Sequence, residues 1–155
     1  MLGDKAEAYY TSVLKKYYPL PVFEGENDVE KGVLWNRIAG AGLKIRWFNE
    51  KIYFCEYLDD GMSKNIRANY IKNFNGYSLW VREILSYKEI PFLDRLKHAV
   101  VYFGIFREKK IPMKELKIKL NVSKIYLLLV VICYIVSLIL NIKPKENKDF
   151  KTRSS

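Results

Sequence analysis

The densest group of side chains that could do chemistry is a run of carboxylates near the start of the sequence. Four acids fall within seven residues, with no basic residue among them: Glu24, Glu26, Asp28 and Glu30. Like charges this close repel one another, so the pKa of at least one carboxyl is expected to rise, which suits a general base. The simpler alternative is that these acids lie beside a helix N-terminus, where the helix dipole stabilises them. Composition alone favours that alternative.

A second polar group lies between residues 56 and 64. Its members are Glu56, Asp59, Asp60, Ser63 and Lys64. Asp60 is followed by a glycine, and this pair suits the backbone angles of a tight turn. By itself the group indicates a turn that leads into a helix capped by Ser63.

Helical periodicity and helix-end signals predict six helices, over residues 4–17, 29–39, 64–73, 76–87, 91–106 and 122–142. Asp4 and Asp28 are the expected N-caps of the first two.

Alternating apolar residues and an aromatic run predict two short strands, over 43–47 and 52–57. Two strands alone do not make a stable sheet, so they are expected to join a sheet whose other strands lie outside this chain. The predicted fold class is therefore α/β, a partial domain with two short strands and a helix-rich C-terminal part. This pattern suggests a truncated domain.

The net charge of +10 is unevenly distributed along the chain. Residues 107–155 contain 12 basic and 4 acidic residues, a net charge of +8, whereas residues 1–106 contain 15 and 13, a net charge of +2. A strongly basic chain can bind nucleic acid. Here the excess flanks an apolar segment rather than a folded face, so nucleic acid is not an expected partner.

That apolar segment, residues 125–142, carries no charged side chain. As a helix its 18 residues would be ~27 Å long, close to the ~30 Å thickness of the hydrocarbon core of a bilayer. Lysines on both sides favour anionic lipid head groups but give no orientation. We expect a membrane-associating helix over 122–142, which could span the bilayer or lie at its surface. The alternative is a helix in a protein core.

These observations divide the chain into four predicted parts. The first is a globular domain over 1–106, and the second is a basic amphipathic connector over 107–121. The membrane-associating helix over 122–142 follows, and a basic, disordered tail over 143–155 ends the sequence.

Several segments together resemble the acceptor-side region of bacterial family 2 glycosyltransferases. They are PVFEGE at 21–26 followed by Glu30, LWNRIA at 34–39, IRWFNE at 45–50 and IYFCEYLDDGMSKN at 52–65. The resemblance covers about residues 2–107, and the order and spacing of the segments carry it. Its pattern is similar to that of enzymes that build capsular or other cell-surface polysaccharides.

The resemblance implies a GT-A-like fold and inverting transfer of a sugar from a nucleotide-sugar to an acceptor hydroxyl. A base in this family often stands seven residues before an arginine, as Glu30 does before Arg37, although Lys31 replaces the Asp of the usual pair. Glu30 is the expected base, and Glu26 and then Glu24 are the alternatives.

The same resemblance implies six substrate-binding residues: Trp35, Asn36, Arg37, Tyr57, Ser63 and Lys64. Asp59 and Asp60 would reach a divalent cation. The simpler alternative is that Trp35 packs in the core and that Arg37 pairs with a carboxylate.

The chain also departs from the family, because it contains neither an Asp-x-Asp motif nor a glycine-rich phosphate loop. The complete enzyme is expected to use Mg²⁺ or Mn²⁺, but no cofactor is supported in this chain alone, which is expected to be inactive by itself. The expected partners are a nucleotide-sugar, a glycan acceptor, membrane lipid and a separate N-terminal half, at the cytoplasmic face of the cell membrane. A different class of function is a non-enzymatic, membrane-associated interaction protein.

Overall fold

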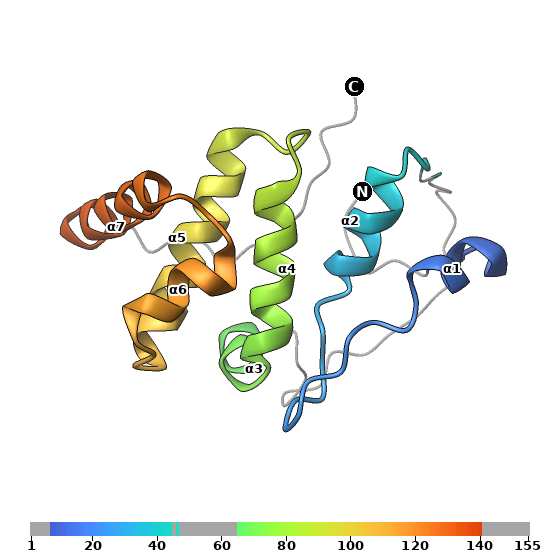
Figure 1. Ribbon diagram of the computed structural model, residues 1–155, viewed down its shortest axis with the longest axis horizontal. Coiled ribbons are helices and arrows are strands. Elements are labelled where there is room, and N and C mark those ends of the chain that lie inside the picture. Colours follow the sequence, from blue (N-terminus) through green and yellow to red (C-terminus); the bar gives the residue numbers. More distant parts are fainter. Residues whose placement is uncertain (1–6, 45, 47–64, 141–155) are drawn as a thin grey trace.

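The computed structural model describes residues 7–44, 46 and 65–140, and 67% of these residues are helical (Figure 1). The described ranges contain seven helices: α1 Thr11–Tyr17, α2 Gly32–Gly40, α3 Ile66–Lys72, α4 Phe74–Ser86, α5 Phe92–Glu108, α6 Met113–Leu120 and α7 Lys124–Ile139.

The predicted α/β fold class is wrong, because the described residues contain no strand. Leu43, Lys44 and Arg46, from the first predicted strand, have no strand geometry, and the second strand, over 52–57, lies outside the described residues. A strand needs a neighbour for its backbone N–H and C=O groups, and this part of the chain supplies none. The apolar side chains recur instead every three or four residues, which lets helices bury their faces against one another.

All six predicted helical regions contain a helix, but the ends differ. Asp28 does not cap α2, which begins after Lys31 without a side-chain capping bond. Asp4 lies outside the described residues. The predicted connector forms a helix of its own, α6, which ends at Asn121 in a left-handed conformation (φ 52°). Asparagine tolerates this conformation and commonly ends helices in this way.

The main core lies between α4, α5, α6 and α7 (Figure 1). Phe74 and Tyr77, on one face of α4, lie against Tyr102 of α5 with ring centroids 5.4 and 5.5 Å away. The Tyr102 hydroxyl is 2.8 Å from the Ser78 hydroxyl, so its buried polar atom has a partner. Val130 of α7 and Leu116 of α6 are fully buried beside these rings.

The other face of α4 receives the N-terminal part of the chain. α2 packs on α4 and α1 on α2, and α2 contributes the buried side chains of Val33, Leu34 and Ile38. α2 and α7 therefore lie at opposite ends of the molecule, with α4 between them (Figure 1). The loop before α2 approaches α4 closely at Gly76, where a Cβ atom would stand 2.7 Å from the Asp28 carbonyl oxygen.

No single helix among the described residues has both the length and the apolar composition needed to cross a bilayer. α6 and α7 meet these two requirements only as a pair, and the pair is bent by 114°.

Candidate functional site

The acidic loop before α2 is held against the N-terminus of α4 through Glu26. Its two carboxylate oxygens accept hydrogen bonds from the backbone N–H groups of Asn75 and Gly76, at 2.7 and 2.8 Å. The first N–H groups of a helix have no partner inside the helix, and a carboxylate there is also stabilised by the helix dipole. Glu26 therefore lies beside a helix N-terminus, as the simpler interpretation of the acidic run predicted. The helix is α4, however, which begins almost 50 residues further along the chain.

Two asparagines of α3 and the α3–α4 junction complete this attachment. The Asn73 side-chain oxygen accepts from the backbone N–H groups of Asn27 (2.9 Å) and Asp28 (3.2 Å). Its side-chain nitrogen donates to Asn69 (2.8 Å), and Asn69 donates to the Asp28 carboxylate (2.8 Å). Sequence reasoning missed both asparagines. The only available signal was an Asn pair at positions i and i+4 next to a helix boundary.

Glu30 is a partly buried carboxylate of the same loop. Burial raises the pKa of its carboxyl above the usual value, and the nearby charge of Asp28 acts in the same direction. A backbone N–H of Gly32 and the charge of Lys31 oppose these effects. The prediction that one acid in the run has a raised pKa is confirmed for Glu30. Desolvation, rather than the predicted repulsion between carboxylates, is the larger cause.

Arg37 pairs with a carboxylate, as the simpler interpretation predicted. Its guanidinium contacts one oxygen of Glu83 on α4, at 2.6 and 3.0 Å. The second oxygen of Glu83 and the side-chain nitrogen of Asn36 are both buried and have no hydrogen-bond partner among the described residues. Arg37 therefore joins α2 to α4. The neighbouring residue, Asn36, has a side-chain N–H donor without a partner among the described residues.

Trp35 lies at the surface, with 38% of the residue exposed, and so is not a core side chain. Its indole N–H donates to the Tyr9 hydroxyl (2.9 Å) and to the Glu7 carboxylate (3.1 Å). Tyr9 donates in turn to Glu7 at 2.6 Å, and burial together with Glu7 raises the pKa of Tyr9 to about 12. This group attaches the segment before α1 to α2.

The other predicted site residues cannot be placed beside Glu30. Tyr57, Asp59, Asp60, Ser63 and Lys64 lie outside the described residues, and Glu24 is exposed in the loop. Within the described part of the chain, no three His, Cys, Asp or Glu side chains are grouped so that they could hold a metal ion. That a complete glycosyltransferase containing this chain would use Mg²⁺ or Mn²⁺ stays a prediction.

A second surface of functional interest runs along α7. Apolar side chains that are largely exposed recur every three or four residues there, which places them on one face of the helix. We call them the α7 stripe: Ile125, Leu128, Ile132, Ile135, Val136 and Ile139. The opposite face packs on α5 through Val130 and Tyr134, the latter edge-on to Phe103 at 5.1 Å.

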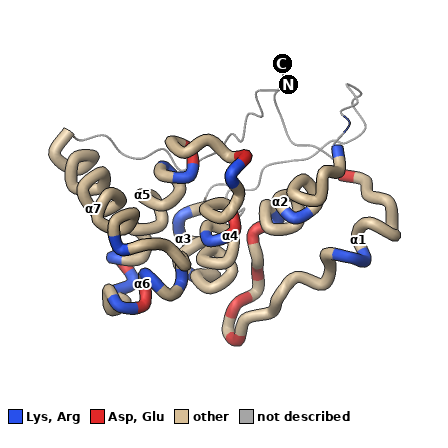
Figure 2. Tube along the Cα trace, turned by 45° about the horizontal axis from the view of Figure 1, so that its top comes forward, with Lys and Arg blue, Asp and Glu red and all other residues tan. Residues whose placement is uncertain are grey.

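Basic residues surround the start of α7. Figure 2 shows them on α6 and at the α6–α7 junction, while acidic residues gather in the loop before α2. Lys114, Lys117 and Lys124 are exposed. Lys119 instead contacts the Asn75 side chain at 2.9 Å, and Lys109 the Ile71 carbonyl oxygen at 2.9 Å. The stripe and the exposed lysines together form an amphipathic surface.

Comparison with known proteins identifies no relative. No protein-family model, no curated protein and no solved structure matches the chain.

The capping contact of Glu26 leads to a stability prediction. Glu26→Ala leaves the N–H groups of Asn75 and Gly76 without a partner, so the free energy of unfolding should fall by about 1–2 kcal/mol. Glu24→Ala, in the same loop but exposed, should change it by less than about 0.5 kcal/mol. Urea denaturation of both variants measures the difference. Equal changes in the free energy of unfolding for the two variants would show that the hydrogen bonds from α4 to Glu26 do not stabilise the fold.

The raised pKa of Glu30 predicts a pH-dependent stability. The folded state keeps the Glu30 proton to a higher pH than the unfolded state does, so the wild type loses stability as pH rises above the unfolded pKa of roughly 4.3. Glu30→Gln removes this loss. The variant should be more stable than wild type at pH 7, and the difference should vanish near pH 4.

Denaturation curves from pH 4 to pH 8 test this prediction, with Glu24→Gln as the baseline for removing a charge. A Glu30→Gln variant that is less stable than wild type at pH 7 would contradict it.

Proposed function

We propose that this chain is the acceptor-side part of a family 2 glycosyltransferase that works at a membrane surface, with Glu30 as the general base. The α/β fold that accompanied this resemblance is wrong for the described residues, so the fold lends the proposal no support. Its support is the resemblance in sequence and the environment of Glu30. The donor would be a nucleotide-sugar and the acceptor a growing surface glycan, at the cytoplasmic face of the cell membrane.

The observation that carries the proposal is the desolvated carboxyl of Glu30. A base works best when its pKa is near the pH at which it acts, and burial moves the Glu30 pKa upward. Two other acids of the run are occupied by the fold, since Glu26 caps α4 and Asp28 binds Asn69. Glu30 is the acid in this loop that combines partial burial with a raised pKa.

The donor half of the reaction would need groups that the described residues do not supply. A divalent cation, when bound, neutralises charge on the departing nucleotide. We propose that a separate N-terminal half holds the nucleotide-sugar and this cation. The present chain would then position the acceptor hydroxyl and take its proton.

Sugar transfer is tested in membranes from cells whose own gene for this chain is replaced by a variant. Removing a general base typically slows a reaction by ~10²–10⁴-fold, so Glu30→Gln should reduce incorporation of labelled sugar from nucleotide-sugars by roughly a hundredfold or more. Glu89→Gln, at an exposed turn, should keep the wild-type rate.

Two outcomes would count against the proposal. A Glu30→Gln rate equal to wild type would remove Glu30 as the base. Incorporation that does not change when the whole gene is deleted would remove sugar transfer itself.

The second candidate function is a non-enzymatic, membrane-associated interaction protein, and the α7 stripe favours it. Six apolar side chains on one exposed face, with lysines at its start, match a helix that lies in the head-group region of a bilayer. Each lysine near an anionic surface contributes roughly 1 kcal/mol. Sugar incorporation that does not change when the gene is deleted, together with binding of the protein to membranes, would favour this second function.

The stripe predicts that a charge at its centre weakens membrane binding. Ile132→Asp should reduce binding to vesicles containing phosphatidylglycerol by roughly tenfold or more, because burial of one Ile side chain contributes ~1.5–3 kcal/mol. Val22→Asp is the matched control, since Val22 is 90% exposed but lies far from α7 in the sequence. Vesicle flotation measures both. Equal flotation of the two variants would exclude the stripe as the binding face.

A further inference from the structure

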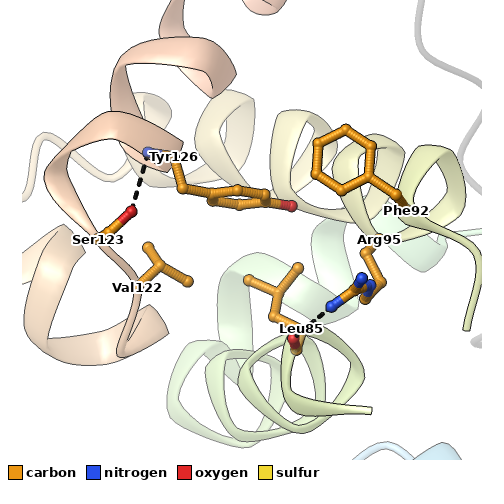
Figure 3. A pocket seen from close by; sticks show the side chains of 6 residues that line it. All are labelled: Leu85, Phe92, Arg95, Val122, Ser123 and Tyr126. Carbon is orange, nitrogen blue, oxygen red and sulfur yellow. Dashed lines mark hydrogen bonds between the residues drawn. The ribbon is translucent and has the colours of Figure 1, made fainter. Parts of the chain in front are cut away.

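A pocket of about 270 Å³ lies where the end of α4, the start of α5 and the α6–α7 connection meet (Figure 3). Its walls are a mixture of apolar and hydrogen-bonding side chains: Leu85, Phe92, Arg95, Val122, Ser123 and Tyr126. Among the described residues, no acidic side chain lines it. None of these six residues belongs to the acidic loop or to the contacts of Glu30.

Arg95 is a cation without a counter-ion in the described part of the chain. Its Nη1 atom donates a 3.3 Å hydrogen bond to the Leu85 carbonyl oxygen, and the neighbouring Asp94 pairs with Lys97 instead. The Arg95 Nε atom is shielded from solvent and has no hydrogen-bond partner among the described residues. A shielded cationic donor without a partner is unfavourable, and an anion in the pocket would remove that cost.

Tyr126 supplies a second unused donor. Its hydroxyl is also shielded and has no partner in the described residues, and its ring extends across the pocket toward Arg95 and Phe92 (Figure 3). Burial raises the pKa of this hydroxyl, while the charge of Arg95 acts in the opposite direction. The net increase keeps the hydroxyl protonated at neutral pH, so it can donate.

Ser123 adds a third group at the N-terminus of α7, a helix of 16 residues. Its oxygen accepts from the Tyr126 backbone N–H at 3.2 Å, and its own hydrogen remains able to donate. The helix dipole favours negative charge at this end. The Arg95 guanidinium and the Tyr126 phenol are donors for an anion with several acceptor oxygens, and a phosphate group matches the fork of an arginine. The Ser123 hydroxyl lies at the other end of the Tyr126 side chain (Figure 3).

We propose that this pocket binds the phosphate group of a phosphate ester, supplied by the head group of a membrane lipid. The apolar walls suit an ester better than a bare ion, because Leu85, Val122 and Phe92 would contact its carbon atoms. The α7 stripe begins at Ile125, two residues after Ser123, and Phe92 at the pocket is 48% exposed. A lipid at the N-terminal end of the stripe would therefore have its head group near the start of α7, on the side where Phe92 borders the pocket.

Entry requires one side chain to move. Phe92 stands edge-on to the Tyr126 ring, with 6.2 Å between centroids, and more of it is exposed than of Tyr126. Rotation of the Phe92 ring toward solvent would open the shielded Tyr126 hydroxyl and Arg95 Nε atoms to the ligand. This inference does not depend on Glu30 or on sugar transfer.

Vesicle binding separates a phosphate site from general attraction to negative charge. Full-length protein is compared on vesicles that contain phosphatidic acid and on vesicles of equal surface charge that contain oleate, a carboxylate. Wild type should bind the phosphate vesicles roughly tenfold more tightly, since a charge-assisted hydrogen bond contributes on that order. Arg95→Gln should remove this preference, and Arg82→Gln, an exposed arginine of α4, should keep it.

Tyr126→Phe keeps the experiment informative if Arg95→Gln does not fold. This variant retains the ring and removes only a hydroxyl that has no partner, so its stability should not fall. Its preference for phosphate vesicles should nevertheless fall several-fold. Equal binding of wild type to both vesicle types, or an unchanged preference in both pocket variants, would overturn the proposal.

A soluble ligand distinguishes the two sources of phosphate. Inorganic phosphate and glycerol phosphate are added to wild type and to Tyr126→Phe, and the thermal midpoint is measured. No protection by either soluble ligand, together with a preference for phosphate vesicles, supports the lipid. The alternative result is that a soluble ligand raises the thermal midpoint of wild type but not of Tyr126→Phe, without any preference for phosphate vesicles. That result would confirm a phosphate site but overturn its assignment to lipid.

Discussion

The start of α4 is the constraint on which the rest of this structure depends. Its first N–H groups need acceptors, and Glu26 supplies them from a loop almost 50 residues away in the sequence. Asn73 binds the backbone of the same loop, and Gly76 provides the space for its close approach. Because α2 follows that loop directly, the position of α2 on α4 is determined at this junction, and the Arg37–Glu83 pair strengthens it further along.

The same junction gives Glu30 its chemical character. The loop that carries Glu30 is held on α4 by Glu26 and Asp28, and the resulting burial raises the Glu30 pKa without a compensating salt bridge from any described residue. A carboxyl held in this way destabilises the folded state at neutral pH, and selection for stability alone would tend to replace it. The backbone N–H of Gly32, at the start of α2, is the one hydrogen-bond donor among the described residues that offsets this cost, and a net cost of this kind is a pattern found at functional groups. Glu26 shows the opposite pattern, since both of its oxygens contribute to the fold.

Local periodicity was sufficient to predict a helix in six regions, because α4, α5 and α7, for example, each place apolar residues three or four positions apart, but it did not predict α6 within the connector. It failed for the residues after Gly42, where short apolar alternation was interpreted as a strand although the described residues offer no neighbouring strand. The pairing of Arg37 with a carboxylate was predicted, but Glu83 was not identified as its partner. Asn69 and Asn73 were missed because they bind a distant loop, Asn73 at its backbone N–H groups and Asn69 at the Asp28 carboxylate, and such contacts leave no periodic signal. The predicted roles of Asp59, Asp60 and the residues near them lie outside the described residues.

The arrangement of the two functional surfaces limits what the proposed acceptor could be. α7 and α2 lie at opposite ends of the molecule, with α4 between them (Figure 1). If the α7 stripe lies on a bilayer, the loop that precedes α2 faces away from the lipid head groups. A hydroxyl on a lipid head group would then stay beside the pocket at Arg95 and would not reach Glu30.

An acceptor that meets Glu30 must therefore extend from the membrane past α4, which a polar glycan chain can do and a short head group cannot. A surface glycan is thus a better fit to this geometry than a simple lipid, and the phosphate pocket is better suited to holding the protein on the membrane than to transferring sugar.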